Sequence, residues 1–339
     1  MLFRSRLVTL FFAATLTIIA ATSPSLHAQV VIDNGLDTNV TNTTVNDLVI
    51  VADDPNPPNN PTTLTVEDPA FIIGDGFDDS LWAVENSIIN ITGGTIQEDV
   101  VSFDNSRINM SGGIAQDDFF AQDNSVVTFS GGTVAEDLNL FDDARVIVNS
   151  GQASGSDTEL ANRSSLTING GVIGDNVTAF NRSFVTMHGG RIVDDLELIG
   201  PNTSALITGG EIGQDIEVLG GEITITGGIL GTQGVFDSGF ASDNGAVITL
   251  VGLMFEIDGV PVSHPTEVNP LTGFLSGTLS DGNSFSDIPF VRGFFGGGPL
   301  PEVPGRILLV PEPSRALLLL LAFTLTLLPR HRRRPSSYS

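Results

Sequence analysis

A pair of glycines recurs through the middle of this 339-residue chain at nearly constant spacing. The pairs follow one another every 18 to 20 residues between about residues 87 and 231, and a Ser-Gly pair fills the one slot that lacks two glycines. The pairs begin at Gly93, Gly112, Gly131, Ser150, Gly170, Gly189, Gly209 and Gly227. A fixed period of this length is typical of solenoids, in which each repeat forms one coil that stacks on the next.

Within each repeat, the residues before the glycine pair alternate between apolar and polar. The positions four and two residues before the first glycine are apolar, as in Ile89 and Ile91, and Asn or Thr usually lies between them. That alternation predicts a β-strand with one buried face. Further apolar columns predict two more short strands per repeat, and no stretch keeps the spacing of a helix. The sequence predicts an all-β fold, a parallel β-solenoid of about eight coils, with glycine pairs that supply positive φ at a sharp corner.

The flanks of the repeat differ from it in composition. A Pro-rich break interrupts a Thr-, Asn- and Asp-rich stretch before the repeat, and Asp-Gly pairs separate apolar strands after it, which predicts antiparallel hairpins. The predicted division is a signal peptide at 1–28, an N-terminal cap and first irregular coils at 29–86, the solenoid at 87–231, a C-terminal β cap at 232–292, a flexible linker at 293–309 and a sorting tail at 310–339.

The composition excludes several kinds of site. The chain has no Cys and no Lys, which rules out disulfides, thiolate nucleophiles, Cys-bound zinc, iron–sulfur clusters and lysine Schiff bases. It carries 40 acidic residues against 14 arginines, for a formal net charge of −26. Half of the arginines lie near the two ends, so the body between them is more acidic still. An acidic body argues against nucleic-acid binding, which depends on basic patches.

The N-terminus has the layout of a secretory signal peptide. Arg4 and Arg6 precede an apolar run over residues 7–21, and residues 26–28 resemble a cleavage site. The apolar run is shorter than the roughly 20 residues that a membrane-spanning helix needs. The sequence therefore predicts export of the chain.

The last 30 residues form a tail of three parts. Pro311, Glu312 and Pro313 come first, an apolar run follows over residues 316–328, and an arginine cluster lies at 330–334. The apolar run predicts a short transmembrane helix with the arginines on the cytoplasmic side of the membrane.

This tail resembles the PEP-CTERM sorting signal of Gram-negative bacteria in the order, spacing and position of its parts. The resemblance implies that Pro311, Glu312 and Pro313 are the sorting motif and that an exosortase-type protease recognises them. It also implies an inner-membrane anchor before sorting, and delivery to the cell surface or extracellular matrix afterwards. An ordinary tail anchor is the alternative.

Acidic residues recur in register with the glycine pairs. The recurrent position holds Asp99, Asp118, Asp137, Asp195 and Asp215, while Asp157 and Asp175 lie close to the same register. Carboxylates stacked about 5 Å apart repel one another, so either backbone N–H groups donate to them at the corner or cations lie between the coils. The five in-register Asp residues are candidate ligands for calcium, which prefers several oxygen ligands. Hydrogen bonding is favoured, because Asp commonly bonds local backbone in turns.

The function favoured by these features is structural or adhesive, at the cell surface or in the extracellular matrix. Outward rows of Thr, Asn, Ser and Asp suit contact with exopolysaccharide, cations or like chains. The alternative is a polysaccharide-degrading lyase or glycosidase of the parallel β-helix type, which would use carboxylates. No catalytic residue stands out. His188 replaces a Thr, Ser or Asn in an outward column, and His264 lies in a turn-like stretch without a metal-ligand partner.

Overall fold

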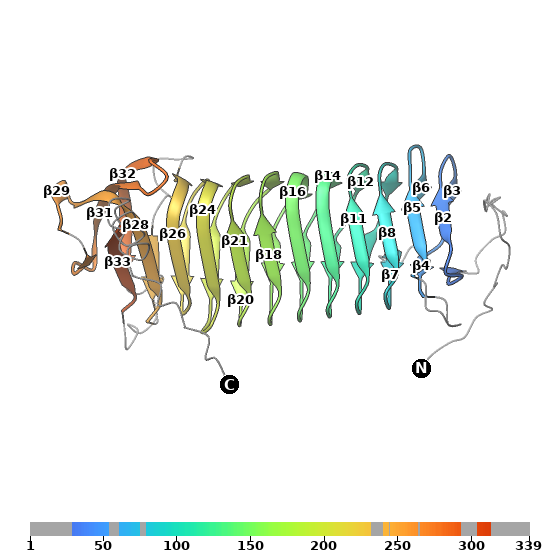
Figure 1. The fold of residues 1–339 in the computed structure, drawn as a ribbon, viewed down its shortest axis with the longest axis horizontal. Coiled ribbons are helices and arrows are strands. Elements are labelled where there is room, and N and C mark those ends of the chain that lie inside the picture. The colour runs from blue at the N-terminus through green and yellow to red at the C-terminus, as the bar shows by residue number, and fades with distance from the viewer. Residues whose placement is uncertain are drawn as a thin grey trace, which may run out of the picture.

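The computed structural model describes residues 29–53, 61–74, 79–231, 240–243, 245–263, 265–292 and 304–312. Every regular element in these ranges is a β-strand, and the strands stack into one elongated rod (Figure 1). The rod is a parallel β-solenoid of about 10 turns with a spacing of about 19 residues. The predicted all-β solenoid is confirmed, whereas the predicted terminal helix lies outside the described residues.

The strands of the rod form three columns, in which each strand pairs in parallel with the strand one coil away. The first column consists of β2 (Asp37–Val40), β5 (Thr63–Val66), β8 (Ile88–Ile91), β11 (Arg107–Met110), β14 (Val126–Val134), β16 (Arg145–Ser154), β18 (Ser165–Ile168), β21 (Phe184–Met187), β24 (Ser204–Ile212), β26 (Glu222–Leu230), β28 (Val247–Ile257) and β33 (Arg306–Pro311). The second column consists of β3 (Thr44–Val45), β6 (Phe71–Ile72), β9 (Thr95–Ile96), β12 (Ile114–Ala115), β19 (Val172–Ile173), β22 (Arg191–Ile192) and the C-terminal halves of β14, β16, β24 and β26. The third column consists of β1 (Val30–Ile32), β4 (Val49–Val51), β7 (Asp79–Ala83), β10 (Asp99–Ser102), β13 (Phe119–Ala121), β15 (Leu138–Leu140), β17 (Thr158–Leu160), β20 (Val177–Phe180), β23 (Leu196–Ile199), β25 (Ile216–Leu219), β27 (Phe240–Asp243) and β32 (Ser284–Arg292).

Pairing in register turns the sequence repeat into straight columns of side chains. Ile89 lies beside Ile108, which lies beside Val127 on the next coil. Coils with an additional residue absorb it at a corner, and the β14–β16 pairing shifts register between Phe129 and Ser130. A residue type that recurs once per coil therefore becomes a row along the rod.

The inward-facing columns form one continuous apolar core from Ile32 to Leu309. Leu64, Ile89 and Ile108 are completely buried, and full burial of such a side chain contributes about 1.5–3 kcal/mol. The core passes without interruption from the first coils into the predicted repeat. The described residues between 29 and 86 thus belong to coils of the same solenoid.

The glycine pairs make a corner in which each glycine has its own role. The second glycine adopts positive φ, 84° at Gly94 and 81° at Gly113, as the sequence predicts. The first glycine permits close stacking, because a Cβ on Gly112 would lie 2.4 Å from the carbonyl oxygen of Thr92 on the preceding coil. Glycine therefore suits both positions for different reasons, and the coil with Ser150 and Gly151 keeps it only at the second, where φ is 93°.

The C-terminal region extends the rod and also folds back on it. The first half of β28 continues the parallel column, and its second half pairs antiparallel with β31 (Thr272–Leu279), which pairs antiparallel with β32. The short strands β29 (Val260–Pro261) and β30 (Thr266–Glu267) pair antiparallel with β28 and β33. Asp-Gly turns lie at the predicted positions, at Asp258-Gly259 and Asp281-Gly282.

The predicted linker at 293–309 ends earlier than the sequence indicates. Residues 306–309 belong to β33, which pairs in parallel with β28. Ile307 and Leu309 are completely buried, so this apolar segment completes the core instead of leaving it. The Gly- and Pro-rich residues before it gave no sign of a further strand.

The corner predicts a large difference between two glycine substitutions. At Gly113, alanine must adopt positive φ, and its Cβ would lie 2.7 Å from the carbonyl oxygen of Gly93. At Gly259, φ is also positive, at 72°, but nothing lies within 4 Å of the new Cβ. We expect Gly259→Ala to cost about 1 kcal/mol of unfolding free energy, and Gly113→Ala to cost roughly 3 kcal/mol or more. Urea denaturation of both variants checks this, and equal losses would contradict the stacking role.

Candidate functional site

The first candidate site is the acidic corner, which we define by the third-column residues that pair in register from coil to coil, namely Val100, Phe119, Leu138, Thr158, Val177, Leu196 and Ile216. The corner consists of the two residues before each of these. The residue directly before them forms one column, which contains Asp99, Asp118, Asp137, Asp157, Asn176, Asp195 and Asp215. All five predicted Asp residues lie in this column. Asp157 belongs to it as well, whereas Asn176, and not Asp175, occupies the column in its coil.

Side chains of this column accept hydrogen bonds from the backbone of the next coil. Oδ1 of Asp118 accepts from the N–H of Asp137 at 3.0 Å, and Oδ1 of Asp137 accepts from the N–H of Asp157 at 3.1 Å. Asp195 accepts from Asp215 in the same way at 2.7 Å. These bonds link successive coils and stabilise the charged form of the carboxylates, which offsets part of the repulsion along the column.

A second acidic row lies one residue earlier at the same corner. It contains Glu98, Asp117, Glu136, Asp175 and Asp194. Burial and a hydrogen bond to Asp194 raise the pKa of Asp175 above its usual value. A hydrogen bond between two carboxyl groups needs a proton, so this pair holds one more readily than an isolated Asp does.

Three carboxylates of the acidic corner converge at Asp99, Asp117 and Asp118. One oxygen from each lies within 4.8 Å of the others, and all three residues are partly buried. Burial, followed by the charges of Asp117 and Asp118, raises the pKa of Asp99 to about 7. Burial also raises the pKa of Asp118, against the hydrogen bond from the N–H of Asp137.

This cluster contains only part of the predicted calcium set. It joins Asp99 and Asp118, and within the described ranges Asp137, Asp195 and Asp215 belong to no comparable group. Asp117 was not predicted, because it lies outside the repeating column and is brought to Asp99 only by the corner between coils. Three carboxylates can provide part of the shell of six to eight oxygens that calcium takes.

The second candidate site lies on the turn edge, the row of turns between the third-column strands and the next first-column strands. The turns place Asp104, Asp123, Asp142, Asn162 and Asn181 in positive φ. Asp and Asn tolerate this conformation better than other non-glycine residues. Carboxylates bond neighbouring coils here too, since Asp123 Oδ2 accepts from the N–H of Asp104 at 3.1 Å.

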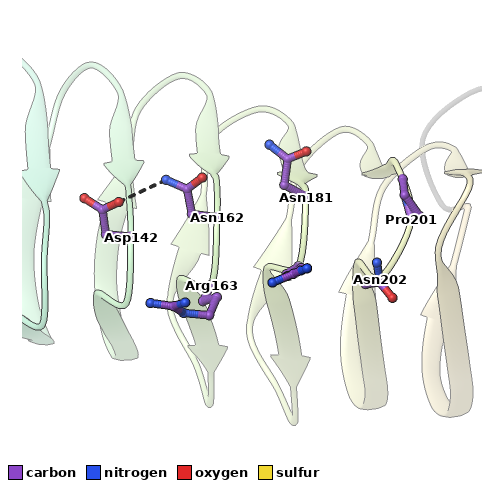
Figure 2. A pocket seen from close by; sticks show the side chains of 7 residues that line it. Asp142, Asn162, Arg163, Asn181, Pro201 and Asn202 are labelled. Atoms are coloured by element: carbon purple, nitrogen blue, oxygen red, sulfur yellow. Dashed lines mark hydrogen bonds between the residues drawn. The ribbon is translucent and has the colours of Figure 1, made fainter.

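An open pocket of about 460 Å³ lies on this edge, and we call it the arginine pocket (Figure 2). It is lined by Asp142, Asn162, Arg163, Asn181, Arg182, Pro201 and Asn202. Figure 2 shows that the labelled side chains come from successive coils, with the Asn162 amide donating to Asp142 at 3.1 Å. The residues lie on exposed turns, so a ligand can reach them directly from solvent.

The two arginines of the pocket differ in their partners. Arg163 forms a two-pronged pair with Asp143, at 2.6 Å from Nε and 2.5 Å from Nη2. This bond lowers the pKa of Asp143. Arg182 is exposed and makes no hydrogen bond or ion pair with the rest of the described chain, and its φ of 118° is unusual for a residue with a side chain.

The sequence analysis did not single out these arginines, although a signal exists. Arg163 and Arg182 occupy the turn position held by Asn86, Asn105 and Asn124 in earlier coils. A change from amide to guanidinium within a regular repeat is visible in the sequence. Only the stacking of coils shows that the two arginines line one pocket.

The two histidines and the sorting motif add no further site. His188 is exposed, and its Nδ1 lies 2.7 Å from Thr208 Oγ1 on the next coil. His264 lies outside the described residues. Pro311 ends β33, and the N–H of Glu312 donates to the carbonyl of Gly252 at 2.9 Å.

The membrane-spanning part of the predicted tail falls outside the structure described. Pro313 and residues 316–328 belong to that undescribed part. Among the residues that are described, no helix is long and apolar enough to span a bilayer.

Comparison with known proteins found no match for the chain among protein-family models, curated proteins or solved structures. Function must therefore be argued from the chemistry of the rod itself.

The raised pKa of Asp99 predicts a pH-dependent gain from Asp99→Asn. The folded state keeps the proton up to about pH 7, whereas the unfolded chain releases it near 3.8, so this carboxyl group lowers stability as the pH rises between those values. We expect the melting temperature of Asp99→Asn relative to wild type to increase from about pH 4 to about pH 7 and then stay constant. Glu159→Gln, at the exposed middle position of β17, controls for the change in net charge.

A comparison of melting temperatures with and without calcium tests whether the cluster of Asp99, Asp117 and Asp118 binds a cation. At pH 7.5 and matched ionic strength, we expect the wild-type melting temperature to be the same in chelator and in millimolar calcium, because corner hydrogen bonds already stabilise the column. A rise in calcium that Asp99→Asn abolishes would contradict this and identify the cluster as a cation site.

Proposed function

We propose that the chain is an exported structural or adhesive rod of a bacterial surface or extracellular matrix, sorted there by an exosortase-type protease. The observation that carries the proposal is the uninterrupted solenoid core, which holds polar rows in register along the length of the molecule. A rod of this kind offers the same chemistry at every coil, which suits a repetitive partner such as a polysaccharide or a like chain.

The outward faces support this role because neighbouring coils are bonded through their side chains. The Asn109 amide donates to Asn90 at 3.0 Å, and the Asn169 amide donates to Asn149 at 2.9 Å. Such ladders hold polar groups in fixed positions about 5 Å apart. A surface that is ordered before binding loses less side-chain entropy when a partner docks.

The proposed sorting rests on the two terminal signals. The described rod ends with the Glu312 N–H bonded to Gly252, at the first residues of the Pro311–Pro313 motif. The predicted tail begins at residue 310, so its first two residues lie within β33 and the rest follows the solenoid directly. We propose that a membrane protease cuts beyond β33 and releases an intact rod. The apolar run and arginines that follow supply the membrane anchor that this route requires.

Sorting is tested by replacing Pro311, Glu312 and Pro313 together with alanine in the producing bacterium. We expect the wild-type protein to lose its tail and reach the cell surface or matrix, and the variant to keep its tail and remain in the inner membrane. The chain offers a matched control, since Pro301, Glu302 and Pro304 form a similar set ten residues earlier. Cell fractionation and the intact mass of the protein provide the readout.

Wild-type protein in the cytoplasm, or the same distribution for both triple variants, would contradict the proposed sorting. Retention of both triple variants in the inner membrane would contradict the assignment of the motif to Pro311–Pro313.

The Asp99 cluster is the observation that favours the alternative, a polysaccharide-degrading enzyme. Asp99, with a pKa of about 7 and two further carboxylates beside it, has the protonation behaviour that a general acid needs. We propose that the protein is not such an enzyme, because the raised pKa follows from packing within the acidic corner. A screen of neutral and acidic polysaccharides checks this, and we expect no release of reducing or unsaturated ends. Product release that Asp99→Asn abolishes would overturn the non-enzymatic proposal.

A further inference from the structure

We infer that the arginine pocket binds an anionic polysaccharide through the carboxylates of its uronic-acid residues. The inference rests on the proposed function and names the partner for one part of the rod. Arg182 holds the carboxylate, and the amides of Asn162, Asn181 and Asn202 bond the sugar hydroxyls.

The charge pattern of the turn edge supports this assignment. In the three coils before the pocket, the turns carry Glu85, Asp104 and Asp123. The next turn carries Asp142, which lines the pocket, and Asp143, which bonds Arg163. In the two coils that follow, the corresponding positions are Asn162 and Asn181, each followed by an arginine. The row of acidic turn residues thus ends at the pocket, and the guanidinium of Arg182 attracts an anion there within a strongly acidic rod.

Arg182 has the free guanidinium that a ligand needs. Arg163 is already bonded to Asp143 through two nitrogens, and Arg191, Arg292 and Arg306 each pair with a glutamate. Arg182 has no such partner within the described ranges, and its backbone adopts a φ of 118°, which glycine would adopt at lower cost.

The chemistry of the pocket matches a carboxylated sugar. A guanidinium presents two parallel N–H donors to a carboxylate, and this geometry gives stronger and more specific binding than a point charge. Asparagine amides both donate and accept, as sugar hydroxyls do. The amides recur at the coil spacing of about 5 Å, which is comparable with the length of one sugar ring.

A second copy of the rod is the other acidic partner to consider, and it fits less well. Two rods with a formal charge of −26 each repel one another along their length. An oligosaccharide carries few charges, and its distant charges are screened beyond about 8 Å at physiological salt. A pocket of about 460 Å³ also has room for a sugar ring, whereas a straight rod edge would lie across its opening.

Isothermal titration of the full-length protein with tetragalacturonic acid tests the inference. We expect saturable binding that weakens as salt is raised, and no binding of the methyl-esterified tetramer, which keeps the shape and loses the charge. Inorganic phosphate and sulfate are titrated in parallel. Binding of these ions as tight as that of the tetramer would identify a general anion site and overturn the inference.

Arg182→Asn is the decisive variant, because asparagine occupies the same turn position at Asn105, Asn124 and Asn202 and lacks the guanidinium. We expect at least a tenfold loss of affinity for the tetramer with an unchanged melting temperature. Arg107→Gln, at an exposed position of β11, removes the same charge outside the pocket and should bind as wild type. Equal binding by Arg182→Asn, or equal losses in both variants, would overturn the inference.

Self-association and cellular location separate this inference from the proposed function. Rods that fail to bind the tetramer but associate with one another through Arg182, measured by sedimentation, would overturn the sugar assignment in favour of a second copy. A protein that reaches the matrix and binds no tetramer would overturn the inference alone. A protein that binds the tetramer but is never exported would support the pocket and overturn the proposed function.

Discussion

In-register parallel pairing between successive coils is the interaction on which the rest of this structure depends. It places each residue beside its equivalent one repeat away, so that apolar positions merge into one core from Ile32 to Leu309. The same pairing brings backbones so close at the corner that a Cβ on Gly112 would meet the Thr92 carbonyl. It also stacks every repeated charge on its neighbour, about 5 Å away. In-register pairing is therefore the cause both of the stability of the rod and of the repulsion between its stacked carboxylates.

Hydrogen bonds between coils offset part of the repulsion between the stacked carboxylates. At the acidic corner, each bonded carboxylate accepts from the coil that follows it, as Asp118 does from Asp137. At the turn edge the direction is reversed, and Asp123 accepts from the coil before it. Where three carboxylates meet at Asp99, these bonds do not suffice, and burial together with the charges of Asp117 and Asp118 raises the pKa of Asp99. Amides and arginines replace carboxylates around Arg182, where the edge becomes suited to an anion.

Most of the fold could be predicted from the sequence, because a fixed period with alternating apolar residues leaves few alternatives. The Asp column could be predicted for the same reason. First irregular coils are expected within residues 29–86, but their boundaries could not be predicted, since the Pro-rich stretch at 54–60 and the missing glycine pairs conceal their period. Asp117 and Arg182 were not predicted either, because Asp117 meets Asp99, and Arg182 meets the other pocket residues, only through the stacking of neighbouring coils. The strand that begins at residue 306 forms by pairing with the edge of β28, and only the folded structure shows that this edge accepts another strand.

Amide hydrogen exchange at the acidic corner measures the bonds between coils at single residues. Side chains of one coil bond the backbone N–H groups of Asp137, Asp157 and Asp215 on the next. With chelator present, we expect these three amides to exchange as slowly as those of the strands that follow them. Exchange at the rate of exposed turns in chelator, slowed only when calcium is added, would contradict the account and show that cations hold the corner together.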